Sequence, residues 1–94
     1  MKKKLVILGA GESGVGAALL AAKMGYDIFV SDSTPVKDTY RKELSEHGIP
    51  FEEGTHTMEK VLGADEIMKS PGIPEKADVM KQIRAKGIPV ISEI

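Results

Sequence analysis

The feature that most constrains this chain is a short apolar run that ends at a glycine-rich turn, LVILGAGESG at residues 5–14. A four-residue apolar run beside glycine is typical of a strand buried on both faces of a parallel sheet. The glycines follow the spacing G-x-G-x-x-G, and residues 15–24 are rich in alanine and leucine, which favour a helix. A strand, a glycine-rich turn and a helix in this order predict an anion site, because a helix begins with unpaired N–H groups at the positive end of its dipole.

Each glycine of the turn has its own mechanical role in a nucleotide-binding loop. We expect Gly9 to permit the tight turn, Gly11 to let a phosphate approach the backbone and Gly14 to pack the helix against the strand. A side chain at Gly11 would block that approach and also strain a turn of positive φ. Ser13 offers a hydroxyl donor to the phosphate or a cap for the helix, and we expect the Glu12 side chain to point to solvent while its N–H faces the ligand.

Composition and charge place the chain among small globular domains. A length of 94 residues suffices for one domain with a modest core, and the net charge of −1 gives no general attraction to nucleic acid or to an anionic membrane. The chain has no cysteine, which excludes disulfides and thiolate metal sites. No segment reaches transmembrane length, and the apolar run after Lys4 is too short for the core of a signal peptide. We therefore expect a single domain over residues 1–94 and a cytoplasmic location.

Apolar runs and helical segments alternate along the chain at short intervals. The pattern predicts strands at residues 5–8, 27–31, 49–52, 66–69 and 89–92, and helices at 15–24, 39–47, 57–62 and 77–86. This alternation predicts a Rossmann-like α/β fold, in which a five-stranded parallel sheet of order 3-2-1-4-5 carries helices on both faces. The chain stops at Ile94 directly after a strand, which suggests a domain cut from a longer protein.

The carboxyl ends of the first, second and fourth strands bring three loops together, at residues 9–14, 32–35 and 70–74. Asp32 follows Gly14 by 18 positions (32 − 14), close to the roughly 20 between a glycine fingerprint and its acidic partner. Its carboxylate would accept a hydrogen bond from a ribose hydroxyl or a base N–H; the alternative is that it caps a helix or a turn. Ser70-Pro71-Gly72 offers either a fixed turn with unpaired backbone donors or a plain exit from the strand.

The remaining polar residues give no sign of catalysis. The chain lacks the G-x-x-x-x-G-K-[ST] motif that binds ATP, and no nucleophile stands with a base. His47 and His56 have no partner at metal-ligand spacing, so we expect neither a metal nor a cofactor here. Glu52 and Glu53 are expected to lie on a solvated face. The chain is therefore expected to bind a ligand, with no catalytic residue of its own.

Four segments together resemble the amino-terminal domain of the Mur ligases. They are GAGESGVG at residues 9–16, VSD at 30–32, KSPGIP at 69–74 and ISEI at 91–94. The resemblance covers essentially the whole chain, and the Ser-Pro-Gly-Ile-Pro loop is its most specific part. It implies a three-domain cytoplasmic enzyme of peptidoglycan synthesis, with a UDP-binding domain, an ATPase domain and an amino-acid domain. Within the family, the likeness is strongest to the ligases that use ATP and Mg²⁺ to form an acyl-phosphate on UDP-N-acetylmuramoyl-L-alanine, which D-glutamate then attacks.

The resemblance also implies which residues meet the UDP moiety. It assigns the diphosphate to Gly11, Glu12, Ser13 and Gly14, the uridine to Asp32 and Ser33, and the closure over uracil to Ser70, Pro71 and Gly72. Uracil presents an N–H donor between two carbonyl acceptors, which suits one carboxylate together with backbone donors. Some members of the family carry a basic residue two positions after the aspartate, whereas this chain has Thr34. We therefore expect no ionic contact at that position.

Two other interpretations remain open. An NAD-binding Rossmann module of a redox or nucleotide-sensing protein would use the same glycines, with Asp32 on the adenosine ribose. That interpretation leaves the loop at residues 70–74 unexplained. A protein-interaction domain would instead leave the glycine fingerprint unexplained.

Overall fold

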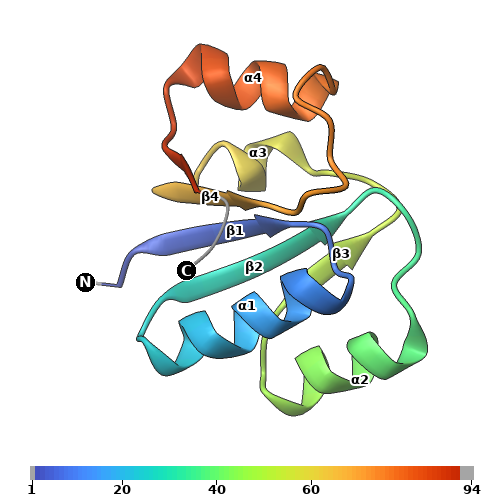
Figure 1. Ribbon diagram of the computed structural model, residues 1–94. Coiled ribbons are helices and arrows are strands. Elements are labelled where there is room, and N and C mark those ends of the chain that lie inside the picture. Colours follow the sequence, from blue (N-terminus) through green and yellow to red (C-terminus); the bar gives the residue numbers. More distant parts are fainter. Residues whose placement is uncertain (1, 92–94) are drawn as a thin grey trace.

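The computed structural model describes residues 2–91 and shows an open parallel sheet with helices on both faces (Figure 1). The strands are β1 (Lys4–Leu8), β2 (Asp27–Asp32), β3 (Phe51–Glu53), β4 (Glu66–Lys69) and β5 (Val90–Ile91). The helices are α1 (Glu12–Lys23), α2 (Asp38–Glu46), α3 (Met58–Val61) and α4 (Asp78–Lys86). The strands are all parallel in the order β3-β2-β1-β4-β5, which confirms the predicted topology. This order places the switch point between β1 and β4.

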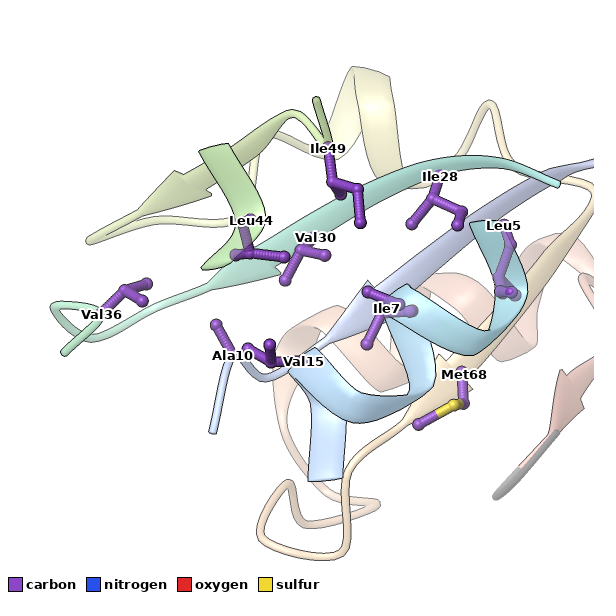
Figure 2. Packing of buried hydrophobic residues seen from close by; sticks show 12 residues of the cluster. Leu5, Ile7, Ala10, Val15, Ile28, Val30, Val36, Leu44, Ile49 and Met68 are labelled. Carbon is purple, nitrogen blue, oxygen red and sulfur yellow. The ribbon is translucent and has the colours of Figure 1, made fainter. Parts of the chain in front are cut away.

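β1 lies inside the sheet, and its side chains alternate between two apolar cores. Leu5 and Ile7 pack beneath α1 and α2 in the cluster that Figure 2 shows, together with Leu44 of α2. Val6 and Leu8 belong to the cluster on the opposite face, beneath α3 and α4. Because helices cover both faces, these four side chains are buried to at least 97% (100 − 3), which explains the unbroken apolar run.

The helices are short, and the sheet provides the surface on which they pack. α1 has 12 residues and buries Val15, Ala18 and Ala21 against the sheet. Two of these three residues are alanines, whose small side chains allow close packing of a helix on a sheet. Among residues 2–91, no helix has both the length and the apolar character that crossing a bilayer requires.

The start of α1 differs from the sequence-based prediction. The helix begins at Glu12, three residues (15 − 12) before the predicted start at Val15. Gly11 is the N-cap, with an extended backbone at φ −84° and ψ −166°. The first turn therefore contains Glu12, Ser13 and Gly14, whose N–H groups have no partner within the helix. This shift places the positive end of the helix dipole inside the glycine-rich loop.

β3 is the other element whose bounds differ by more than one residue. It begins at Phe51, whereas the prediction began at Ile49. The Ile49 side chain is buried in the core beneath α1 and α2, and Pro50 has no N–H to donate to a neighbouring strand. The Pro50 carbonyl still accepts a hydrogen bond from the Val30 N–H at 3.1 Å. The predicted end of the fifth strand, Ser92, lies outside the described residues.

Candidate functional site

A cavity of about 500 Å³ lies at the carboxyl ends of β1, β2 and β4. Its walls come from the three loops that the sequence predicted to meet there, and they comprise Gly9, Gly11, Ser13, Asp32, Ser33, Thr34, Ser70, Pro71, Gly72 and Ile73. Of the predicted site residues, the structure places Glu12 and Gly14 outside this wall. Glu12 is exposed and lines an adjoining cavity of about 260 Å³, while Gly14 is buried behind the loop. We call the larger cavity the edge cavity.

Two glycines of the loop are required by the backbone of the fold. Gly9 has φ of +102°, and a Cβ there would lie 2.6 Å from Ser70 Oγ. A Cβ on Gly14 would lie only 1.9 Å from the carbonyl oxygen of Gly9, so α1 packs against the end of β1 at this point. These contacts match the roles expected for the first and third glycines of the fingerprint.

Gly11 differs from its two neighbours. Its φ of −84° lies in the range open to all residues, so our expectation that a side chain would strain a turn of positive φ is wrong. That backbone conformation belongs to Gly9 instead. Apart from Gly11 and its neighbours along the chain, no atom of the described residues lies within 4 Å of the position that a Cβ on Gly11 would occupy. The fold therefore leaves open space at Gly11, on the wall of the edge cavity, where a ligand can approach the backbone.

The amino end of α1 supplies unpaired donors to the edge cavity. Gly11 is the N-cap and no side chain caps the helix, so the idea that the Ser13 hydroxyl is the cap is wrong. Ser13 lies in the first turn, is exposed and lines the edge cavity together with Gly11. The first N–H that bonds within the helix is that of Val15, which donates to the Gly11 carbonyl at 2.9 Å. The unpaired N–H groups before Val15 are the donors that the predicted anion site requires.

Asp32 joins two of the three loops through its side chain. One carboxylate oxygen, Oδ2, accepts the Ala10 N–H at 2.8 Å. The other, Oδ1, accepts the N–H and the hydroxyl of Thr34 at 2.9 and 2.8 Å. The turn-capping alternative therefore describes a real contact. A carboxylate has about four acceptor positions, so one on Oδ2 stays available for a ligand.

The same contacts keep Asp32 ionised. Burial by itself raises the pKa of this half-buried carboxyl, because desolvation disfavours charge. The hydrogen bonds from Ala10 and Thr34 outweigh that effect and hold the pKa of Asp32 below its ordinary value. The side chain is thus a carboxylate at neutral pH and acts only as an acceptor.

Ser70 presents a hydroxyl that has no hydrogen-bond partner among the described residues, although its oxygen is buried. The backbone is well held, because the Ser70 N–H donates to Leu8 at 3.1 Å and its carbonyl accepts from Ile73 at 3.1 Å. A buried hydroxyl without a partner costs about 1–3 kcal/mol, so such a group normally meets water or a ligand. Its place on the wall of the edge cavity makes it a candidate ligand contact.

Glu52 and Glu53 do not lie on a solvated face, contrary to our expectation. Glu52 accepts hydrogen bonds from the N–H and hydroxyl of Thr57 and, at 2.8 Å, from the Ser31 hydroxyl. Glu53 accepts the Val36 N–H and an Arg41 N–H, both at 2.8 Å. The signal that could have revealed the role of Glu52 is Ser31, a polar residue in an apolar strand, because a buried hydroxyl needs a partner.

Comparison with known proteins was made for the sequence and for the fold. The family model described as "Mur ligase MurD-like, N-terminal domain" matches residues 3–92. The UDP-N-acetylmuramoylalanine–D-glutamate ligase of Cytophaga hutchinsonii is 61% identical over 94 residues, which are 100% of this chain and 21% of that protein. The Bacteroides fragilis ligase of the same name is 55% identical over 92 residues, 98% of this chain and 21% of that protein. The chain thus spans about a fifth of these curated relatives.

Solved structures share the fold at lower sequence identity. A murein peptide ligase from Psychrobacter arcticus has a TM-score of 0.85 at 22% identity, over 96% of this chain and 19% of that one. An imine reductase from Myxococcus stipitatus, solved with NAD⁺, has a TM-score of 0.65 at 16% identity, over 96% of this chain and 40% of that one. At these identities the likeness concerns the fold alone.

Proposed function

The chain belongs to the MurD-like family of Mur ligase N-terminal domains, and on that premise we propose that it binds the UDP moiety of UDP-N-acetylmuramoyl-L-alanine. The observation that carries the proposal is the edge cavity, where the unpaired N–H groups of α1 and the unpartnered Ser70 hydroxyl lie together. A volume of about 500 Å³ is within the range of small-molecule sites. The cavity therefore offers donors and space to a nucleotide with a charged diphosphate.

The diphosphate is assigned to the amino end of α1. The backbone N–H groups of Glu12 and Ser13 and the Ser13 hydroxyl supply donors, and the helix dipole favours the negative charge. The exposed Glu12 carboxylate is a like charge, so its side chain is assigned to solvent. Gly14 contributes by letting the helix pack close to β1.

The uridine is assigned to the other two loops of the edge cavity. The remaining acceptor position of Asp32 accepts the uracil N–H or a ribose hydroxyl, and Ser33 lies beside it on the cavity wall. The turn offers the Ser70 hydroxyl and the Gly72 N–H to the uracil carbonyls, because the Ser70 N–H is already bonded to the Leu8 carbonyl. Pro71 limits the conformations of that turn and so supports a preformed base pocket.

The rest of the proposal concerns the complete ligase, of which this chain is assigned as the first of three domains. The complete enzyme uses ATP and Mg²⁺ to form an acyl-phosphate on the substrate carboxyl, and the D-glutamate amine then displaces phosphate to form the amide. Among the described residues, no group of three or more acidic or histidine side chains could hold a metal ion. From the three-domain organisation that the family implies, we assign ATP, Mg²⁺ and D-glutamate to the other domains, and the whole enzyme to the cytoplasm.

Calorimetric titration of the chain with UDP tests this assignment directly. We expect weak, saturable binding with one site, because the contacts of two further domains are missing. Lys23→Ala, at the exposed carboxyl end of α1 and outside the cavity wall, serves as the control. Absence of saturation with both UDP and the UDP-muramoyl substrate would contradict the proposal.

A further inference from the structure

A buried polar cluster lies behind the edge cavity, at the carboxyl end of β2. Its centre is Ser31, which is 0% exposed and lies in an otherwise apolar part of the strand. Its Oγ lies 2.8 Å from Glu52 Oε2 and 2.7 Å from His56 Nδ1, with a longer contact of 3.4 Å to the Thr55 carbonyl. From the sequence, Glu52 was expected on a solvated face, and His56 had no partner at metal-ligand spacing.

The geometry determines which atoms of this cluster carry protons. Burial raises the pKa of Glu52, but hydrogen bonds from Thr57 and Ser31 outweigh it and hold the pKa below its ordinary value. The carboxylate can only accept, so the single hydroxyl hydrogen of Ser31 points to Glu52. The Ser31 oxygen then needs a donor at the 2.7 Å contact, which makes His56 Nδ1 the protonated ring nitrogen.

His56 is neutral in this arrangement. Burial lowers the pKa of His56, and the carboxylates of Glu52 and Asp32 oppose that effect only in part. Lys60 is the cation that acts on Glu52 from α3 and offsets some of the negative charge there. A neutral ring with its proton on Nδ1 leaves Nε2 as an unprotonated acceptor.

The cluster is linked directly to the glycine-rich loop. The Ser31 carbonyl accepts the Gly9 N–H at 2.8 Å, and the adjacent Asp32 accepts the Ala10 N–H at 2.8 Å. The end of β2 thus holds two successive backbone N–H groups of the loop. β3 is three residues long and pairs with Val30, Ser31 and Asp32 at this end of β2, and the side-chain bonds from Glu52 and His56 to Ser31 add to that ladder.

We propose that His56 is a positioning residue for the glycine-rich loop, acting through the Ser31 hydroxyl and the end of β2. The His56 ring and Glu52 hold Ser31 from one side, while the Ser31 carbonyl and Asp32 hold Gly9 and Ala10 from the other. The orientation of the loop, and with it the affinity for a nucleoside diphosphate, depends on the Nδ1–H donor. The affinity part of this proposal rests on the proposed function; the loop part does not.

The first test is the tautomer of His56 in the chain without ligand. Nitrogen chemical shifts of the imidazole at pH 7.5 are expected to show a protonated Nδ1 and an unprotonated Nε2. His47, which is exposed at the end of α2, serves as the internal reference. A protonated Nε2 with a bare Nδ1 at His56 would overturn the proposal, because the Ser31 oxygen would then lack its donor.

The second test compares variants of His56. Asn can place an N–H near the position of Nδ1, whereas Ala removes the donor and Gln places its N–H near the position of Nε2. We expect His56→Ala to shift the amide signals of Gly9 and Ala10 and to weaken UDP binding about tenfold, as for a lost hydrogen bond to a buried group. His56→Asn should keep both within about twofold of the unsubstituted chain. His47→Ala is the matched control and should change neither.

The outcomes separate this proposal from the proposed function. A role confined to stability would lower the denaturant midpoint of His56→Ala while leaving the Gly9 and Ala10 signals and UDP affinity unchanged, and would overturn the proposal. If the unsubstituted chain does not bind UDP but the two signals still move, the proposed function fails and the positioning role stands. If His56→Ala does not fold, His56→Asn against His56→Gln decides, because only Asn should retain the two amide signals.

Discussion

At the scale of single residues, Asp32 serves the fold while one acceptor position of its carboxylate stays available for the proposed ligand. Its carboxylate ties the glycine-rich loop to the loop after β2, through Ala10 and Thr34. The position of Asp32 after the glycines indicates a ligand contact, and its hydrogen bonds show a structural contact. The two interpretations are compatible, because one acceptor position stays open.

Asp32→Ala removes both contacts at once. We expect it to weaken UDP binding by about 1–3 kcal/mol, the usual loss for a charge-assisted hydrogen bond. Calorimetry measures the affinity, and chemical denaturation of the same variant measures the accompanying loss of stability. Glu46→Ala, which removes an exposed carboxylate of α2 outside the cavity, is the control and leaves the Ala10 and Thr34 bonds in place. An Asp32→Ala chain that binds UDP as tightly as the unsubstituted chain would contradict the assignment.

Glu52 gives the fold a dependence on pH. Its pKa is held below the ordinary value of 4.5 in the folded chain, so it contributes stability above that pH, which is lost as the pH falls through the folded value. The pKa of Asp32 is also held below its ordinary value of 3.8, so Asp32 likewise contributes stability that is lost as the pH falls through its folded value. Denaturant unfolding between neutral and acid pH should show that Glu52→Gln is less stable than the unsubstituted chain at neutral pH. Its free energy of unfolding should also fall less steeply as the pH is lowered. If the unfolding free energy of Glu52→Gln and of the unsubstituted chain depended on pH in the same way, the hydrogen bonds from Thr57 and Ser31 would not stabilise the Glu52 charge.

At the scale of elements, the glycine-rich turn and α1 form one unit whose three glycines are needed for different reasons. Gly9 and Gly14 are required by the fold, because a side chain at either would meet Ser70 or the Gly9 carbonyl. Gly11 has an ordinary φ and open space around it. The sequence pattern treats the three glycines alike. In the structure, Gly9 and Gly14 are needed for packing, whereas Gly11 leaves space for a ligand to approach the backbone.

This difference predicts opposite results for two matched substitutions. Gly11→Val should weaken UDP binding at least tenfold while changing stability by no more than about 1 kcal/mol, the scale of an N-cap effect. Gly14→Val should instead destabilise the fold by about 3 kcal/mol or more, because its Cβ would lie 1.9 Å from a backbone oxygen. Denaturation and calorimetry on both variants measure the two quantities. Unchanged UDP affinity in Gly11→Val would count against the diphosphate site.

The elements themselves were predictable because their signals are local. Apolar runs bounded by glycine predicted the strands, and their alternation with helices after a glycine-rich first loop predicted the order of the strands in the sheet. The described bounds agree with the predicted ones to within one residue, except at the start of α1 and at β3. The meeting of three loops followed from the topology alone. The buried cluster was not predictable in this way, because Glu52 and His56 lie 21 and 25 residues from Ser31. The contact of Asp32 with Ala10 spans 22 residues and was missed for the same reason.

At the scale of the whole molecule, the chain is one sheet with two apolar cores and a single loop-lined edge that collects the predicted residues. It spans about a fifth of the length of its curated relatives, so binding by this chain can be measured apart from the rest of such a protein. The shared fold does not by itself distinguish UDP from NAD, because an NAD-bound reductase has a similar architecture. We propose that the loop at residues 70–74 makes that distinction, since its prolines would restrict the space beside the base.

The most direct test of the account is an NMR titration of the chain with UDP and, separately, with NAD. UDP should shift the amide signals of Glu12, Ser13, Asp32, Ser33 and Gly72 together, because these residues lie on or beside one cavity. NAD should shift them weakly or leave them unchanged, because adenine lacks the imide edge of uracil and its bulk would press on Pro71. Tighter binding of NAD than of UDP would contradict the account.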